Sequence, residues 1–418
     1  MKALNIRTTI FFYLAGMVVI HLAVLSSLKQ MIRMGYPDFT IYYCAGTMVR
    51  QGLGHELYND VAQFKVRREF LPEAANRLGK SPYNHPPFEA VFFAPLTYLS
   101  YPRAFIFWDV LNLAMLMALP FLLRPQLLSL QNFSWPLWIL ACVAFFPTFF
   151  ALLQGQDSIL LLFLYTLGFV DLAKGNDTRA GGWLGLGLFK PQLVVPFIFF
   201  MFLCGRRKML YGFLPLAAAL GLLCAAIVGW QGLSSYPQYV LHLEATMARG
   251  AIVPADMPNL RGVLYLLLPG VLHVDVVTVT LSVCIFLFTV WQGCKIGTGK
   301  IGRVKIGSGS LFPWQFALAV VTTVIVSYHC LGYDLSILLL PVMLLVHELR
   351  KESHPREWSG VVIMVAVGVL FFSPLQLLLL LRFNRLALAG WAVLLWMVGI
   401  AGQISTRTRL RGPVRSAS

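Results

Sequence analysis

The stretch TTIFFYLAGMVVIHLAVLSSL, residues 8–28, decides the fold class of this chain. It contains no Asp, Glu, Lys or Arg, and an α-helix of about 20 apolar residues crosses the ~30 Å hydrocarbon core of a bilayer. Lys2 and Arg7 precede the stretch, and no small-residue cleavage site follows it. We therefore expect residues 1–28 to form a signal anchor that stays in the membrane as the first span.

The composition extends this conclusion to the whole chain. Of its 418 residues, 58% are hydrophobic and only 12% are charged, with a mean hydropathy of +0.74. Soluble domains carry about 25% charged residues, so these values exclude a soluble enzyme, a disordered chain and a secreted disulfide scaffold. The net charge of +16 comes from basic residues that lie between apolar runs. This is typical of loops that contact membrane lipids, and we expect no nucleic-acid partner.

The apolar runs predict an all-α polytopic membrane protein with about ten transmembrane helices. Beyond the first span, they cover about residues 103–123, 133–152, 158–173, 210–230, 274–294, 311–328, 333–347, 360–381 and 386–404. Residues 29–102 are too polar to face lipid, and we expect a folded extracytoplasmic loop with an interfacial helix. Residues 103–404 then form the multi-span bundle, and residues 405–418 form a basic tail.

The distribution of basic residues predicts the orientation of the bundle. Apart from the long segment 29–102, Lys and Arg collect in every second loop, beginning with the N-terminus, as the positive-inside rule requires of short cytoplasmic loops. We therefore expect both termini in the cytoplasm and the protein in the inner (plasma) membrane. The loops at 29–102, 154–157, 231–273, 329–332 and 382–385 then lie outside.

One apolar stretch, residues 180–204, carries Lys190 and Pro191 near its middle. Pro191 lacks a backbone donor, and the glycines before it allow close packing, so we expect a re-entrant hairpin with Lys190 at its apex. An ionisable residue within a membrane segment is costly and is a functional candidate by default.

Polar residues gather in the segments that this topology places outside. Asp38 and Tyr42 follow the first span, and other polar or aromatic residues occur at the ends of later runs. These are Tyr83, His85, Gln154, Gln156, Asn259, Arg261, His329, Tyr333 and Asp334.

Each of these residues has a functional and a structural interpretation. Asp38, close to the outer end of a span, could serve as a general base or could cap the helix that follows. Lys190 and Arg261 could hold a phosphate, although an interfacial arginine also extends to lipid headgroups. His329 could donate to a phosphate oxygen or simply complete a polar turn. Gln154 and Gln156 could bind sugar hydroxyls or close a tight turn.

Several common catalytic motifs are missing from the sequence. It has no P-loop, no GxSxG, no HExxH and no adjacent acidic pair in the outer loops, and its cysteines lack metal-ligand spacing. We therefore expect no nucleotide site and no metal.

Taken together, these segments resemble glycosyltransferase family 87, the polyprenyl-phosphate-sugar-dependent, alpha-mannosyltransferase-like enzymes of the GT-C fold. The resemblance extends from about Asp38 to Asp334 and rests on the order and spacing of its elements. These are Asp38-Phe39 with Tyr42-Tyr43, Leu57-Tyr58, Tyr83 to Pro87, Pro95-Leu96, Trp108 with Asn112, Gly155-Gln156, Gly181 to Pro191, Asn259 to Gly262, and His329 with Tyr333-Asp334.

The resemblance implies a GT-C-like bundle whose site faces the outside of the cell. A mannose-like hexose or a pentose would pass, with inversion, from a polyprenyl-phosphate donor to a glycolipid or cell-envelope glycan acceptor, and no cofactor would be required. Asp38 would be the general base, and Lys190, Arg261 and His329 would face the donor phosphate. The candidates for sugar and acceptor binding are Tyr42, Tyr83, His85, Gln154, Gln156, Asn259, Tyr333 and Asp334.

A second class of function also fits a polytopic chain with a broken helix. A secondary transporter or flippase for a lipid-linked saccharide or an anion would place Lys190 near the middle of the bilayer. Such a protein should carry polar residues deep within several helices and show two related halves. Here the polar residues concentrate in the outer loops and no repeat is evident, so the sequence favours the enzyme.

Overall fold

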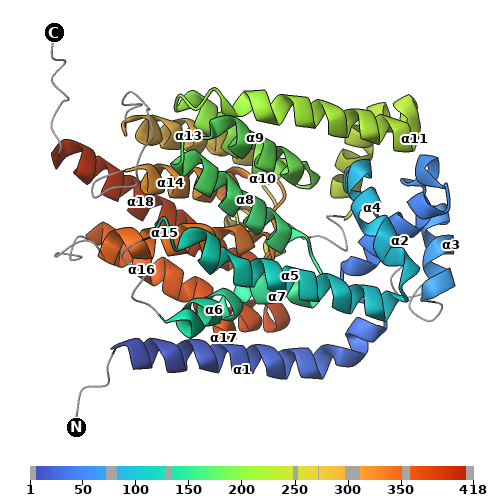
Figure 1. Cartoon of the computed structure of the whole chain (residues 1–418), viewed down its shortest axis with the longest axis horizontal. Helices are drawn as coiled ribbons and strands as arrows, with labels where there is room; N and C mark the ends of the chain where they lie inside the picture. The colour runs from blue at the N-terminus through green and yellow to red at the C-terminus, as the bar shows by residue number, and fades with distance from the viewer. Residues whose placement is uncertain are drawn as a thin grey trace.

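The structure is a computed structural model that describes residues 6–71, 82–127, 134–247, 253–271, 273–296, 311–350 and 358–410. Within these ranges all regular secondary structure is helical, which confirms the expected all-α class. The helices run roughly side by side, and α1 (Ile6–Arg33) begins at the same end of the bundle at which α18 (Gly390–Leu410) ends (Figure 1).

Five helices in the described ranges are long and apolar enough to cross a membrane. They are α1, α5 (Tyr101–Leu123), α11 (Met209–Met247), α13 (Val274–Cys294) and α18. Two bent pairs raise the number to seven if each pair forms one span. A polytopic protein is therefore confirmed, whereas the expected number of ten spans is not.

The bent pairs break where a proline follows the bend. The first pair, α6 (Trp135–Ala144) and α7 (Phe146–Gln154), turns by 63°, with Pro147 in the first turn of α7. The second pair, α16 (Trp358–Phe371) and residues Ser373–Arg382, turns by 61°, with Pro374 near the start of α17 (Ser373–Leu377). Proline lacks the backbone N–H that a continuing helix would use, so it is tolerated at the start of the new segment.

The three other expected spans are shorter helices. They are α8 (Ser158–Ala173), α14 (Phe312–Val326) and α15 (Leu339–Arg350), which follows the 3-10 turn Asp334–Leu338. In α14 every residue from Phe312 to Ile325 is buried, so this helix is surrounded by other helices rather than by lipid. An interior helix does not have to match the thickness of the hydrocarbon region.

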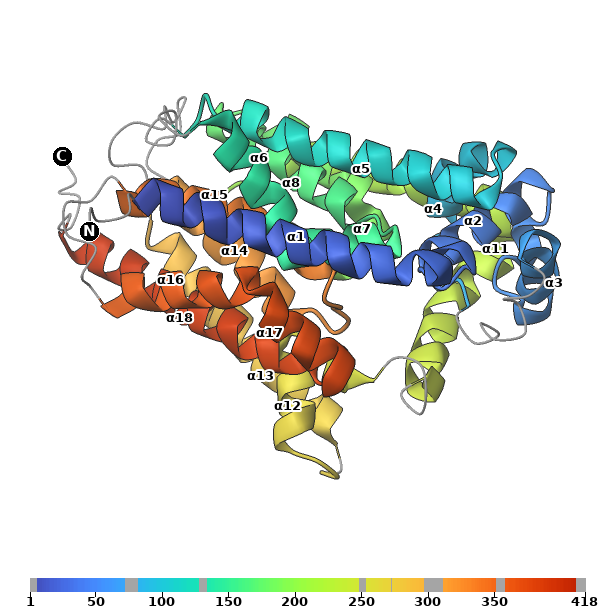
Figure 2. The ribbon, with the colours of Figure 1, turned by 90° about the horizontal axis from the view of Figure 1, so that it is seen from below.

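The polar segment after α1 folds onto the opposite end of the bundle from the two termini. It contains α2 (Phe39–Arg50), α3 (Asp60–Phe70), α4 (Pro87–Phe93) and the 3-10 turn Ala94–Tyr98 (Figure 2). An aromatic core of its own, which includes Phe39, Tyr42, Phe93 and Trp108, joins these helices to α5. This folded segment therefore rests directly on the membrane helices.

The segment with Lys190 consists of two half-helices. Helix α9 (Asp177–Leu186) and a 3-10 turn (Gly187–Phe189) precede Lys190, and α10 (Pro191–Leu203) follows it. Close packing depends on glycine, because a Cβ at Gly181 would lie 1.9 Å from the carbonyl oxygen of Met209. At the far end of the hairpin, Arg206 Nη1 and Asp177 Oδ1 form an ion pair at 3.1 Å. The expected break at Lys190 is therefore present.

Helix boundaries differ from the expected domain limits at two places. Helix α1 extends beyond residue 28 to Arg33, and α18 extends beyond residue 404 to Leu410. The basic tail thus begins inside a helix, and its residues 411–418 lie outside the described ranges. The remaining helix, α12 (Leu260–Leu267), precedes α13 and packs against it.

Candidate functional site

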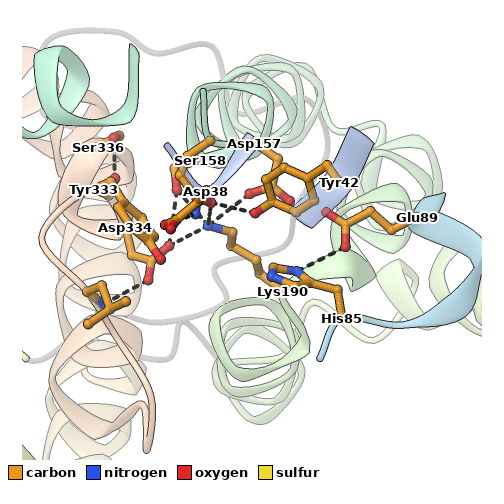
Figure 3. Close-up of polar contacts among 12 residues, drawn as sticks. Asp38, Tyr42, His85, Glu89, Asp157, Ser158, Lys190, Tyr333, Asp334 and Ser336 are labelled. Atoms are coloured by element: carbon orange, nitrogen blue, oxygen red, sulfur yellow. Dashed lines mark hydrogen bonds and ion pairs between the residues drawn. The ribbon is translucent and has the colours of Figure 1, made fainter. Parts of the chain in front are cut away.

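Segments that are far apart in the sequence meet where α2 begins (Figure 3). The start of α2, the turn between α7 and α8, the break between α9 and α10, and the turn before α15 all contribute side chains. The resulting polar cluster contains Asp38, Tyr42, His85, Glu89, Gln156, Asp157, Ser158, Lys190, Tyr333 and Asp334.

Asp38 occupies the N-cap position of α2, but its side chain makes no capping hydrogen bond. Its Oδ2 atom instead accepts a hydrogen bond of 2.7 Å from Gln156 Nε2. Its backbone N–H donates to Gln154 Oε1 at 3.1 Å. Burial raises the pKa of the Asp38 carboxyl, while hydrogen bonds from Gln156 and Tyr333 oppose that rise. The carboxylate is therefore directed into the cluster rather than onto its own helix.

The turn that carries Gln154 and Gln156 depends on Gly155. Its φ of +60° lies in the left-handed region, and a Cβ there would meet Phe39 Cβ at 2.7 Å. The Gly155 carbonyl accepts a hydrogen bond of 3.0 Å from Trp108 Nε1. The backbone thus closes this turn, and both glutamine side chains remain available to contact Asp38.

Gln156 is oriented by contacts on both sides of its amide. Its oxygen accepts hydrogen bonds from the Tyr42 hydroxyl at 2.6 Å and from Lys190 Nζ at 3.3 Å. Its nitrogen therefore points to Asp38, where only an acceptor is present. Tyr42 and Lys190 thus orient the side-chain amide of Gln156, and this amide orients the carboxylate of Asp38, the candidate base.

Lys190 is buried within the cluster, with a side chain that is 3% exposed. Its Nζ atom lies 2.6 Å from Ser158 Oγ, 2.6 Å from Asp334 Oδ1 and 2.9 Å from Asp157 Oδ1. The ammonium also lies 4.9 Å from the centre of the Tyr333 ring. Through these contacts Lys190 joins the turn between α7 and α8 to the turn before α15.

A second part of the cluster centres on Glu89, in the first turn of α4. Its Oε2 atom lies 2.9 Å from His85 Nδ1 and 3.5 Å from the Tyr83 hydroxyl, which also donates to the Pro86 carbonyl at 2.8 Å. The ring of His85 meets that of Tyr42 edge-on, with centroids 5.0 Å apart. Tyr83 and His85 are therefore joined to the Asp38 side of the cluster.

The ionisation of these groups reflects their burial. Burial raises the pKa of Glu89 well above its usual range, and the nearby Asp157 carboxylate raises it further. Burial lowers the pKa of His85 to about 4. For Asp157, burial is the largest influence and would raise the pKa, but the charge of Lys190 and the hydrogen bonds with Glu89 and Lys190 together outweigh it and lower the pKa. In the protein alone, Glu89 therefore holds a proton far more readily than Asp157.

Arg261 and Asn259 lie at the start of α12 and contact the segment that leads to Tyr333 and Asp334. Asn259 Nδ2 donates to the Ser327 carbonyl at 2.7 Å. Arg261 Nη1 donates to the Tyr328 carbonyl at 3.3 Å, and its guanidinium lies 3.8 Å from the centre of that tyrosine ring. Arg261 is 5% exposed, so its side chain is folded into the protein and does not extend outward.

His329 follows these contacts directly. Its backbone carbonyl accepts a hydrogen bond of 2.6 Å from Ser327 Oγ. Its charge is one of the influences that lower the pKa of His85, after burial, which is the main cause. The turn of residues 327–334 therefore connects Arg261 and Asn259 to the central cluster.

All of the site residues predicted from the sequence thus lie in one network or beside it. Asp38, Tyr42, Tyr83, His85, Gln154, Gln156, Lys190, Tyr333 and Asp334 are connected by the contacts above, and Asn259, Arg261 and His329 adjoin them through the 327–334 turn.

Sequence reasoning missed Glu89, Asp157 and Ser158 as members of this network. The signal for Glu89 was a single acidic residue in the apolar run PFEAVFF, four positions after His85. Among the described residues, His85, Glu89 and Asp157 also form a group that could hold a metal ion, because one ligand atom from each lies within 4.8 Å of the others.

Comparison with protein families gives a match over just over half of the chain. The model of glycosyltransferase family 87 matches residues 83–298, a range that contains Glu89, Gln156, Lys190 and Arg261. Neither a curated protein nor a solved structure matches the chain.

Proposed function

This chain belongs to glycosyltransferase family 87, and on that premise we propose that it transfers a sugar from a polyprenyl-phosphate donor to a glycolipid or cell-envelope glycan. The family and the apolar helices make it a membrane glycosyltransferase, an enzyme of class EC 2.4. The membership favours the enzyme over the transporter or flippase. The donor, the acceptor and the extracytoplasmic location of the reaction are our proposal.

The observation that carries the proposal is the environment of Asp38. A general base must hold a free carboxylate oxygen near the reacting hydroxyl and must have a pKa close enough to the working pH. Asp38 makes no helix-capping contact, and burial raises the pKa of its carboxyl. Gln156 and Tyr333 hold the carboxylate in one orientation. These features suit a base better than a structural carboxylate.

The proposed reaction is a single displacement that inverts the anomeric centre. The acceptor hydroxyl gives its proton to Asp38 as its oxygen forms a bond to the anomeric carbon. The bond between that carbon and the phosphate oxygen breaks, and the lipid phosphate leaves with the electron pair. Cationic or hydrogen-bonding groups that contact the phosphate would stabilise the charge that develops there.

We assign the donor phosphate to the side of the cluster that carries Lys190, His329 and Arg261. Arginine and lysine are the usual partners of phosphate oxygens in proteins. Lys190 already contacts Ser158, Asp157 and Asp334, so a phosphate would replace one of these partners. Arg261 and His329 border the same turn and would approach the phosphate from the other side.

The other predicted residues would surround the sugar and the acceptor. Tyr42, Tyr83 and His85 supply aromatic faces and polar edges next to Asp38, and Gln154 and Gln156 supply amides. Carbohydrates are commonly held by this combination of ring faces and hydrogen-bonding groups. Asn259, Tyr333 and Asp334 complete the set beside the phosphate.

The charge distribution supports an extracytoplasmic site. The end of the bundle opposite the cluster carries Arg206 at the base of the α9–α10 hairpin, Lys295 after α13 and Arg407 near the end of α18. Basic residues at that end favour its placement in the cytoplasm. The folded segment with α2–α4 and the cluster would then face the outside (Figure 1).

The proposal is tested with the full chain in lipid nanodiscs. Radiolabelled polyprenyl-phosphate mannose or GDP-mannose is supplied with an envelope-lipid extract, and transfer of label to the extract is measured. We expect transfer from the lipid-linked donor only. Further lipid-linked hexoses and pentoses identify the sugar. Transfer from the nucleotide sugar, or transfer from none of the lipid-linked donors, would contradict the proposal.

A further inference from the structure

Three potential metal ligands converge on the side of the cluster away from Asp38. His85 Nδ1 lies 2.9 Å from Glu89 Oε2, and one ligand atom each of His85, Glu89 and Asp157 lies within 4.8 Å of the other two. Two ligand atoms that each lie about 2.1 Å from one metal ion are at most about 4.2 Å apart, and the His85–Glu89 pair is within this limit. Figure 3 shows Glu89 and His85 turned toward each other beside Tyr42.

Among the described residues, two oxygen atoms in this group lack a hydrogen-bond partner unless Glu89 and Asp157 share a proton across their own contact. Glu89 and Asp157 are each 1% exposed, and Glu89 Oε1 and Asp157 Oδ2 are buried without a hydrogen-bond partner. A buried carboxylate oxygen that lacks a partner is costly. Asp157 Oδ1 contacts the ammonium of Lys190. This contact does not compensate the negative charge on Asp157 Oδ2 or on Glu89 Oε1. These two atoms require either a proton or a cation.

The balance of charge around the group also calls for a cation. The acidic side chains of the cluster are Asp38, Glu89, Asp157 and Asp334, and Lys190 is its central cation. Several negative charges around one lysine in a buried site are unstable unless some are protonated or bound to a metal.

We propose that His85, Glu89 and Asp157 bind a divalent metal ion of the Mn²⁺ type. One imidazole nitrogen with two carboxylates is a mixed donor set that suits Mn²⁺ or Zn²⁺ better than an all-oxygen site suited to Ca²⁺. This site was not predicted because Asp157 is far from His85 and Glu89 in the sequence. The expectation of no metal rested on the absence of an adjacent acidic pair.

Neighbouring residues would orient these ligands. The Tyr83 hydroxyl lies 3.5 Å from Glu89 Oε2, and Lys190 Nζ lies 2.9 Å from Asp157 Oδ1. Such second contacts hold ligating side chains in position in metal sites. Three protein ligands leave further coordination positions for water or for a substrate oxygen.

The test measures metal binding without turnover. The full chain in nanodiscs is stripped with a chelator and titrated with MnCl₂, and free Mn²⁺ is followed by electron paramagnetic resonance. We expect one bound Mn²⁺ per chain for the wild type, with binding about tenfold weaker or worse for Glu89→Gln and for Asp157→Asn. The matched control is Glu56→Gln, because Glu56 lies outside the cluster and its side chain is 40% exposed.

Two results would overturn the site. One is a wild-type chain that binds no more Mn²⁺ than empty nanodiscs, which would mean that Glu89 and Asp157 share a proton instead. The other is equal Mn²⁺ affinity in the wild type, Glu89→Gln and Asp157→Asn. Because neither donor nor acceptor is present, this test is independent of whether the proposed glycosyl transfer is correct.

Discussion

The side-chain amide of Gln156 donates a hydrogen bond of 2.7 Å to the carboxylate of Asp38. The two residues are supplied by different parts of the chain, the turn between α7 and α8 and the start of α2. A donor that contacts the ionised carboxyl stabilises it and lowers its pKa. Gln156 is therefore a positioning residue that also sets the strength of the proposed base.

Replacing Gln156 tests this role. We expect Gln156→Ala to reduce the rate of transfer by about 10- to 100-fold, because a hydrogen bond to a charged group is worth about 1.5–3 kcal/mol. Loss of the donor should also raise the pKa of Asp38 and move the rate profile to higher pH. The comparison is Gln154→Ala, since Gln154 contacts only the backbone of Asp38. If the pH midpoint of the rate profile is the same in Gln156→Ala as in the wild type, Gln156 does not set the pKa of Asp38.

The wild-type pH profile gives a second prediction. Burial raises the pKa of Asp38, and a base must be ionised before it can accept a proton. The rate should therefore be low at acid pH and should increase as the pH rises through this raised pKa. Single-turnover rates measured across the pH range in nanodiscs provide the check. A rate that falls over the same interval would indicate that Asp38 acts in its protonated form.

Lys190 should matter for stability as well as for activity. Lys190→Met leaves Asp157 and Asp334 buried without their cation, which typically costs about 3–5 kcal/mol. We expect a clear decrease in the thermal unfolding midpoint. The double variant Lys190→Met/Asp334→Asn should recover part of this loss, because it also removes one of the uncompensated charges. If the thermal unfolding midpoints of the single and double variants are equal, the ion pair between Lys190 and Asp334 does not stabilise the fold.

Gly155 allows a prediction about the turn that positions both glutamines. In Gly155→Ala the new Cβ would meet Phe39 Cβ at 2.7 Å and Phe105 Cε2 at 2.8 Å, with φ in the left-handed region. We expect a loss of about 1–3 kcal/mol and a lower rate of transfer. Gly175→Ala is the matched control, because Gly175 also has a positive φ but has no atom within 4 Å of the new Cβ. If the two variants lose the same stability and the same transfer rate, the contacts of the new Cβ at Gly155 have no effect.

The orientation of the bundle can be tested by labelling cysteines in intact cells. Val61 in α3 is 77% exposed at the end with the cluster, and Lys174 is exposed in the turn between α8 and α9. A membrane-impermeant maleimide should label Val61→Cys in intact cells and Lys174→Cys only after permeabilisation, each above the wild-type background. The reverse pattern would place the cluster in the cytoplasm.

Much of the site was predictable because polar residues at the ends of apolar runs are expensive unless they interact. Asp38, Gln156 and Lys190 each interrupt or border an apolar run, and topology alone brought them to one end of the bundle. Glu89 was missed because its neighbours are apolar and its partners, other than His85, are set by tertiary packing.

Helix lengths were less predictable than helix positions. Hydropathy identifies the part of a helix that faces lipid. The helix itself extends as far as its backbone hydrogen bonds continue, which can be beyond the apolar part. Thus α18 continues to Leu410, and α11 consists of two helical segments that meet at a kink at Gly229, whose φ is 74°, with the second segment ending at Met247. Conversely, α14 has only 15 residues, and other helices bury it from Phe312 to Ile325; the hydropathy of the sequence does not distinguish such an interior helix from one that faces lipid.

The central claim is that Asp38 removes the proton from the acceptor. Its most direct test is single-turnover transfer from a polyprenyl-phosphate sugar in nanodiscs, comparing the wild type with Asp38→Asn, with donor binding measured for both. We predict equal donor binding and a rate lower by about 10²- to 10⁴-fold for Asp38→Asn, the usual contribution of a general base. Transfer at the wild-type rate by Asp38→Asn would contradict the claim.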